Sequence, residues 1–334
     1  MQSNLLPPPN TPPLTATQAS IVCGTDFSES ATRAVEVGAA LAQRLGETLV
    51  LTHAVNDQPS ESLPGELRES LSLYARAQLH DERERLQAMH VEMVEAFHTG
   101  AVGAVLLEEA ASRHARLLIL GAAKRRSLSR RLVGSVSESV AEAADSPTLV
   151  VRDSTPLLQW ARGERRLRVF VGADLSAPSE AALRWVAWLR QVAPCDVVAA
   201  CLDAGIPTYP TTDLFPSLLM DEMVLKAAHV QERYFRERVR SLLGRSRVRV
   251  RYEKNWGHSD AHLIQLAGEE RADLIVIGTH SRCGWHRLGH HSVSRGVLRY
   301  APLNVVCVPS RATEQLRSDS ATLNRPCNHQ AHEN

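Results

Sequence analysis

The sequence predicts an α/β protein with two tandem open parallel five-stranded sheets, each covered by helices on both faces. The first observation behind this prediction is that one order of segments occurs twice, over residues 20–152 and again over residues 167–310. The second is that short apolar runs alternate with longer amphipathic runs in both halves. The third is that each half opens with an apolar run leading into an aspartate, Asp26 or Asp174. We call residues 20–152 copy one and residues 167–310 copy two.

The predicted elements follow the same order in both copies. Runs rich in Val, Ile and Leu indicate strands, and runs with apolar residues every three or four positions indicate helices. In copy one we expect strands over residues 21–25, 48–54, 91–97, 117–121 and 148–151, and helices over residues 30–45, 67–88, 102–113 and 136–144. In copy two we expect strands over residues 168–173, 196–202, 247–254, 273–278 and 304–308, and helices over residues 178–192, 220–243, 260–270 and 293–300.

The remaining segments have compositions that do not predict a core. Residues 1–19 are rich in proline and are expected to form a disordered leader. Residues 153–166 contain Pro156, Gly163 and several charges, and we expect a linker there. Residues 311–334 are polar without a hydrophobic period, so we expect a disordered tail.

Charge and composition narrow the classes of partner. The chain of 334 residues has 38 Lys and Arg against 37 Asp and Glu, so no overall positive field favours nucleic acid. No stretch approaches the ~20 apolar residues of a membrane span, and no secretory leader is visible, so we expect a cytoplasmic protein. Cys23, Cys201 and Cys307 lie inside apolar strand patterns and are expected to be buried, reduced thiols.

One loop in copy one has the features of a phosphate-binding cradle. A strand ends at Gly121, Lys124 follows, and after nine further residues Gly134 and Ser135 open the next helix. Free backbone amides and the helix dipole favour anions at such a helix start, and the hydroxyls of Ser135 and Ser137 add donors. Carboxyl ends of parallel strands are also where ligands bind in doubly wound sheets.

With this loop, the aspartate after the first strand and the strand ending in His53 and Ala54, the chain resembles the universal stress protein family. The resemblance covers both copies and implies a Rossmann-like fold of the adenine-nucleotide alpha-hydrolase type, binding of ATP or another adenine nucleotide without catalysis, and a role in stress response. In copy one it implies contacts from Asp26, Ala54, Gly121, Lys124, Gly134, Ser135, Val136 and Ser137. In copy two it implies contacts from Asp174, Gly278, Ser292 and Ser294.

The family pattern is incomplete in both copies. Lys124 stands where the family has a second glycine, so its side chain blocks the ligand or binds the phosphates. In copy two Ser281 and His291 replace the later glycines. The alternative is therefore a degenerate scaffold that binds no nucleotide and acts through protein contacts.

Three further interpretations stay open. Asp26 and Asp174 could simply cap the helices that follow them. Cys283 and the histidines around it suggest a metal or redox sensor, but their spacing fits no zinc motif, so we expect no metal. The sequence lacks the motifs of hydrolases and Walker-type ATPases, and His53 is expected to be a packed side chain, so we expect no enzyme.

The last strand of each copy, 148–151 and 304–308, would leave an exposed apolar edge. We expect the two edges to pair within one chain, as a pseudo-twofold pair of domains, with a homodimer as a further possibility. We also expect a binding switch, in which nucleotide orders residues 121–134 and changes the surface offered to a protein partner.

Overall fold

The computed structural model describes residues 19–56, 64–122, 134–203, 217–255, 257–279 and 293–312, with side chains for all of these except residues 217–224. The strands are β1 (Ser20–Gly24), β2 (Thr48–Val55), β3 (Met93–Thr99), β4 (Leu117–Gly121), β5 (Thr148–Val151), β6 (Leu167–Gly172), β7 (Cys195–Asp203), β8 (Val248–Lys254), β9 (Leu274–Thr279) and β10 (Asn304–Pro309). The helices are α1 (Glu29–Leu45), α2 (Gly65–Leu86), α3 (Val102–Ser112), α4 (Ser135–Ala143), α5 (Thr155–Ala161), α6 (Ala177–Val192), α7 (Ser217–Leu243), α8 (Ser259–Glu269) and α9 (Val293–Tyr300), with a short 3₁₀ turn η1 (Gln87–Met89). Every predicted strand and helix is found, with its ends shifted by only a few residues.

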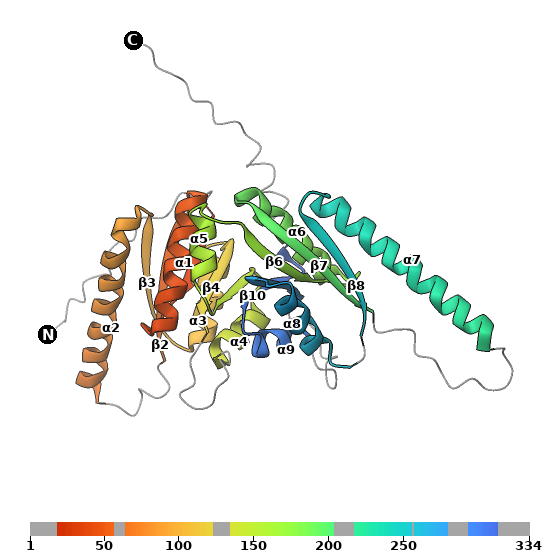
Figure 1. Cartoon of the computed structure of the whole chain (residues 1–334). Helices are drawn as coiled ribbons and strands as arrows, with labels where there is room; N and C mark the ends of the chain where they lie inside the picture. Colours follow the sequence, from red (N-terminus) through yellow and green to blue (C-terminus); the bar gives the residue numbers. More distant parts are fainter. Residues whose placement is uncertain are drawn as a thin grey trace, which may run out of the picture.

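The described strands form one sheet in the order β3-β2-β1-β4-β5-β10-β9-β6-β7-β8. Within each copy all neighbours are parallel, and the first strand lies between the second and the fourth. The predicted parallel five-stranded arrangement is therefore confirmed for both copies. They are joined into a single ten-stranded sheet instead of standing as two separate sheets (Figure 1).

The joint between the copies is the antiparallel pair of β5 and β10. Leu149 lies opposite Val306. By strand register these two residues are equivalent, since they pair with Ile119 and Val276, each two residues before the glycine of the fourth strand in its copy. Equivalent residues thus face each other, as they do on a twofold axis. The predicted pairing of the two last strands is confirmed, and it removes both apolar edges from solvent.

Side chains from alternate positions of the strands enter different cores. On one face of the sheet, a core shared by both copies contains Cys23, Trp160, Trp185 and Phe235, under α1, α2, α5, α6 and α7. On the other face, α3 and α4 cover one cluster around Leu106 and α8 and α9 cover a second, with α4 contributing to both. The two copies therefore share one continuous core on that face.

The segment predicted as a linker is also part of this core. Residues 155–161 form α5, in which Pro156 occupies the first turn, where a missing backbone N–H costs no helical hydrogen bond. Trp160 is 1% exposed, and its Nε1 donates to the carbonyl oxygen of Pro194 at 3.1 Å. Residues 153–166 join the two copies as predicted for a linker, but α5 within them was not predicted, because the surface it packs on comes from both copies.

Cys23, Cys201 and Cys307 are buried, as predicted, and Cys195 is buried as well. Burial raises the pKa of Cys201 and of Cys307 to about 12, so both stay as thiols at neutral pH. The predicted leader and tail lie outside the described residues, apart from their innermost positions. Within the described part of the chain, no helix is both long and apolar enough to cross a membrane.

Candidate functional site

The fold brings the predicted site residues to the carboxyl ends of the strands. In copy one, β1 and β4 are neighbours, and the chain leaves β1 toward α1 on one face and leaves β4 toward α4 on the other. In copy two, β6 and β9 have the same relation. A crevice opens where strand order reverses in this way, which is where ligands bind in such sheets.

The two aspartates hold the turns that precede α1 and α6, but they do not cap these helices. The Oδ1 of Asp26 accepts a hydrogen bond from the backbone N–H of Ser28 at 3.0 Å, and the Oδ1 of Asp174 accepts one from Ser176 at 2.8 Å. Ser28 and Ser176 are the N-cap residues. The capping interpretation of the aspartates is therefore wrong, and their Oδ2 atoms make no hydrogen bond with the described residues.

Asp174 is held more firmly than its counterpart in copy one. The Ser179 hydroxyl donates to its Oδ1 at 2.6 Å, whereas copy one has Ala31 at the equivalent position. Burial raises the pKa of Asp174, but the hydrogen bonds from Ser176 and Ser179 outweigh this, so the pKa lies below its usual range. Copy two thus presents an ionised, oriented carboxylate.

Gly121 and Gly278 are required by packing. A Cβ on Gly121 would lie 2.5 Å from the carbonyl oxygen of Ser30, in the first turn of α1. A Cβ on Gly278 would lie 2.2 Å from the carbonyl oxygen of Pro178, in the first turn of α6. In both copies the fourth strand ends against the backbone of a helix start, so these glycines need no ligand to explain them.

The start of α4 carries the other predicted residues of copy one. Gly134 is the N-cap of α4, with extended backbone (φ −65°, ψ 152°) and no side-chain cap, and Ser135 and Val136 form the first turn. Ser137 is buried, and its hydroxyl donates to the carbonyl oxygen of Gly121 at 3.0 Å. This bond fixes the helix start beside the end of β4. Lys124 lies outside the described residues.

Copy two contains a cavity of about 290 Å³ at the predicted place. Asp174, Gly278 and Ser294 all line it, as does Val293 at the start of α9, whereas Ser292 lies outside the described residues. The sequence analysis did not predict the apolar residues that line this cavity, which are Leu202, Leu263 and Ile277. Their strand and helix patterns predict burial, but nothing in the sequence alone shows that they border a cavity.

In copy one, the strand ends carry an aromatic group that the sequence did not predict. The ring of Phe27 lies 4.5 Å from that of His53, which in turn lies 6.0 Å from Phe97, and the guanidinium of Arg76 lies 4.0 Å from the Phe97 ring centroid. The Nδ1 of His53 is 2.8 Å from the carbonyl oxygen of Thr25. His53 is therefore engaged in packing, as expected. Ala54 follows it in β2, beside the turn of Asp26.

The comparisons with known proteins decide the family. The model of the universal stress protein family matches residues 19–152 and matches again over residues 166–309. The chain belongs to the universal stress protein family. Both copies are members, which confirms the resemblance found in the sequence.

Solved structures agree with this at the level of the fold. A universal stress protein from Archaeoglobus fulgidus DSM 4304 gives a TM-score of 0.65 at 16% identity, over 88% of this chain and 99% of that one. A protein of unknown function from Pseudomonas aeruginosa PAO1 gives a TM-score of 0.58 at 13% identity, over 92% of this chain and 98% of that one. At such identities the likeness shows the fold alone. None of the curated proteins matches the sequence.

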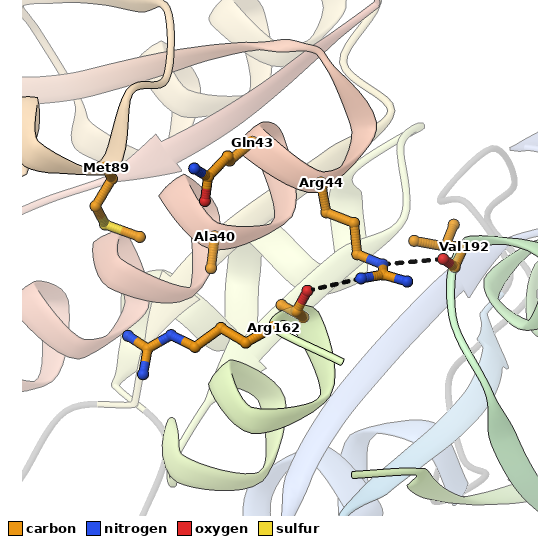
Figure 2. A pocket seen from close by; sticks show the side chains of 7 residues that line it. Ala40, Gln43, Arg44, Met89, Arg162 and Val192 are labelled. Atoms are coloured by element: carbon orange, nitrogen blue, oxygen red, sulfur yellow. Dashed lines mark hydrogen bonds between the residues drawn. The ribbon is translucent and has the colours of Figure 1, made fainter. Parts of the chain in front are cut away.

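This tandem universal stress protein has another cavity, of about 330 Å³, away from the carboxyl ends of the strands (Figure 2). It lies where α1, α5 and the end of α6 meet, and Arg44 crosses it. The Nε of Arg44 donates to the carbonyl oxygen of Val192 at 2.9 Å, and its Nη1 donates to that of Ala161 at 3.0 Å. The guanidinium thus neutralises two helix ends and ties the copies together, and none of the predicted site residues lines this cavity.

A metal site was not expected. In the part of the chain that the structure describes, no three side chains of the ligating types gather closely enough to hold a metal ion. The cluster around Cys283 lies outside the described residues.

Proposed function

We propose that this chain is a non-catalytic module that binds an adenine nucleotide, with ATP as the expected ligand, and acts in stress response. The observation that supports it most is the cavity of copy two, which is lined by both Asp174 and the start of α9. A volume of about 290 Å³ is near the lower end of small-molecule sites, which span roughly 300–1,000 Å³. The cavity therefore suits the base and sugar, with phosphates extending toward the helix start.

The residues present fit such a ligand. The unbonded Oδ2 of Asp174 is an acceptor of the kind that an exocyclic amino group needs, and Leu202 and Leu263 offer flat apolar contact to a ring. Val293 and Ser294 belong to the first turn of α9, and the positive end of the helix dipole there favours phosphate. Asp26, Gly134 and Ser135 have the corresponding places in copy one.

The first experiment is to denature freshly purified protein, identify any released nucleotide by chromatography, and titrate ATP into the wild type by calorimetry. Asp26→Asn and Asp174→Asn then test each copy. Asparagine keeps the Oδ1 that accepts the turn hydrogen bond but replaces the free acceptor oxygen by a donor. We expect at least one of the two substitutions to weaken ATP binding about tenfold or more. Unchanged affinity in both variants would contradict base recognition by these carboxylates.

Gly134→Asp and Gly134→Asn test the helix start of copy one as a matched pair. Both residues are favoured at an N-cap, so neither should destabilise α4. Only aspartate adds a negative charge where phosphate would bind, so we expect Gly134→Asp to weaken binding at copy one and Gly134→Asn to retain it. Equal behaviour of the two variants would exclude phosphate at this place. Hydrogen exchange over residues 121–137 with and without ATP tests the proposed switch.

A scaffold without nucleotide remains the second candidate, and the surface of α2 favours it. Leu67, Leu71 and Tyr74 follow one another at helical spacing and are 46%, 46% and 65% exposed. Apolar side chains gathered on an exposed helix suit a protein contact. A chain that is purified without nucleotide and gives no heat with ATP would support this function and overturn the first.

A further inference from the structure

The opposite ends of the copy-two strands carry a cluster of arginines that the proposed function does not use. Arg168, Arg247, Arg249 and Arg271 line a cavity of about 470 Å³ at the amino ends of β6, β7 and β8. We call it the arginine groove. In Figure 1 the start of β8 lies beside the end of α7, away from α9.

Two of the four guanidinium groups have no carboxylate partner among the described residues. Arg249 pairs with Glu270, and Nη1 of Arg247 lies 3.4 Å from Oδ1 of Asp196. Arg168 donates only to a backbone carbonyl oxygen, that of Arg271, at 3.4 Å. The Arg271 guanidinium has no partner of any kind within the described chain.

The charge balance of the groove is positive. Asp196 and Glu270 are the acidic residues that line it, against the four arginines. Arg166 reaches the same Asp196 at 3.0 Å, so that carboxylate is already shared between two cations. The groove thus combines an excess of positive charge with guanidinium groups that are free to bind an anion.

Copy one provides an internal control for the role of the arginines. By strand register, the residues equivalent to the four arginines are Ser20, Glu92, Val94 and His114. The strand register is the same in both copies, and so is the left-handed residue that follows the helix, with φ of 47° at His114 and 50° at Arg271. The fold therefore does not require arginine at any of these places.

We propose that the arginine groove binds a small anion with two or more phosphate groups, of the oligophosphate class. Guanidinium groups bind phosphate oxygens in pairs and keep their charge at any relevant pH, which suits four of them around one ligand. The cavity volume lies within the range of small-molecule sites. The chain has a net charge of only +1, so it lacks the broad positive field that gathers nucleic acid.

The test uses the full-length chain and sodium tripolyphosphate, titrated by calorimetry at low salt. Arg168→Gln/Arg271→Gln removes the two unpaired guanidinium groups. Arg68→Gln/Arg83→Gln removes the same charge from exposed positions on α2 and is the matched control. We expect the groove variant to lose tripolyphosphate affinity about tenfold to a hundredfold and the control to lose little. Thermal unfolding of both variants confirms that they are folded.

The possible outcomes separate this proposal from the nucleotide site. Binding that persists unchanged in the groove variant would place the anion elsewhere, for example at the strand carboxyl ends, and would overturn the proposal. Equal losses in both double variants would mean general charge attraction and would overturn it as well, as would a wild type that binds no tripolyphosphate. Since Asp26→Asn and Asp174→Asn leave the groove intact, they should not change tripolyphosphate binding even if they abolish ATP binding.

Discussion

Gly278→Ala is a severe test of the packing at the end of β9. The new Cβ would lie 2.2 Å from the carbonyl oxygen of Pro178 and 2.3 Å from its carbonyl carbon, where an ordinary contact begins at 3.4 Å. Backbone cannot swing aside as a side chain can, so the first turn of α6 would have to move by about 1 Å. Because α6 buries Trp185 and Trp188 in the shared core, we expect a loss of about 3 kcal/mol or more in the free energy of unfolding.

Two other glycines separate this clash from the general effect of replacing glycine. Gly268 lies in α8, and a Cβ added there would have no other atom within 4 Å, so alanine should be neutral or stabilise by up to about 1 kcal/mol. Gly46 ends α1 at φ 67° with equally open surroundings, so alanine there should cost about 1 kcal/mol from backbone strain alone. Urea denaturation of the three variants should rank Gly268→Ala as most stable and Gly278→Ala as least stable.

A Gly278→Ala protein within about 0.5 kcal/mol of the wild type would refute the close approach of α6 to β9. The result also bears on the function. If the glycine serves packing, then loss of nucleotide binding in a Gly278 or Gly121 variant says nothing about ligand contact. Asp174→Asn and Gly134→Asp avoid this ambiguity because each preserves the local hydrogen bonds or cap.

Two further predictions concern the shared core and the surface charges. Trp160→Ala should cost about 3–5 kcal/mol in urea denaturation, whereas Tyr300→Ala, at a 53% exposed residue, should stay within about 0.5 kcal/mol; equal effects would mean that α5 is peripheral. Hydrogen bonds from Arg238 and Arg184 lower the pKa of Glu180 from 4.5 to about 2. A lowered carboxyl pKa stabilises the fold above the unfolded value, so Glu180→Gln should cost up to about 1 kcal/mol at pH 7, and this difference should shrink as the pH falls from 4.5 toward 2. A difference that is constant with pH would contradict the ion pairs.

The sequence predicts the strands and helices well because local pattern and duplication carry the same information. Each strand is a short apolar run and each helix has a matching period, and the second copy repeats the order. The pairing of β5 with β10 was also predictable, since two apolar edge strands in one chain have few other ways to be covered.

Helix α5 could not be predicted from the same rules. Its seven residues are too few for a clear helical period, and its proline and the glycine at position 163 are typical of loops. What stabilises it is contact with residues far away in the chain, such as the bond from Trp160 to Pro194. Tertiary contacts of this kind leave no local pattern.

For the candidate site, the sequence predicts positions better than roles. Asp174, Gly278 and Ser294 do meet at one cavity. But the cap of α6 is Ser176 rather than the aspartate, and the glycine is explained by a helix backbone. The role of the glycine depends on a distance between two segments that lie far apart in the chain. The identity of the cap depends on which of two nearby side-chain oxygens bonds to the helix start. A residue pattern contains neither kind of information.

The joint between the copies shows why the tandem arrangement is more than two identical domains. Asn304 and Arg152 occur once each, since by strand register the equivalent residues are Pro147 and Pro309. Oδ1 of Asn304 accepts a hydrogen bond from the backbone N–H of Arg152 at 2.8 Å. The buried Arg152 guanidinium donates to the carbonyl oxygen of Leu298, near the end of α9, and to that of Leu303, just before β10.

Two copies of copy one, paired in the same way, would bring two Arg152 side chains to the joint without an asparagine to meet them. Burial already lowers the pKa of Arg152 to about 10, so a second buried cation at the same joint would be costly. Pairing of copy one with copy two is therefore favoured over pairing of copy one with copy one through this strand. Because each copy has the other as its fixed partner, the residues at the strand ends do not have to be the same in the two copies. The residues around Asp174 and those of the arginine groove both differ from the equivalent residues in copy one.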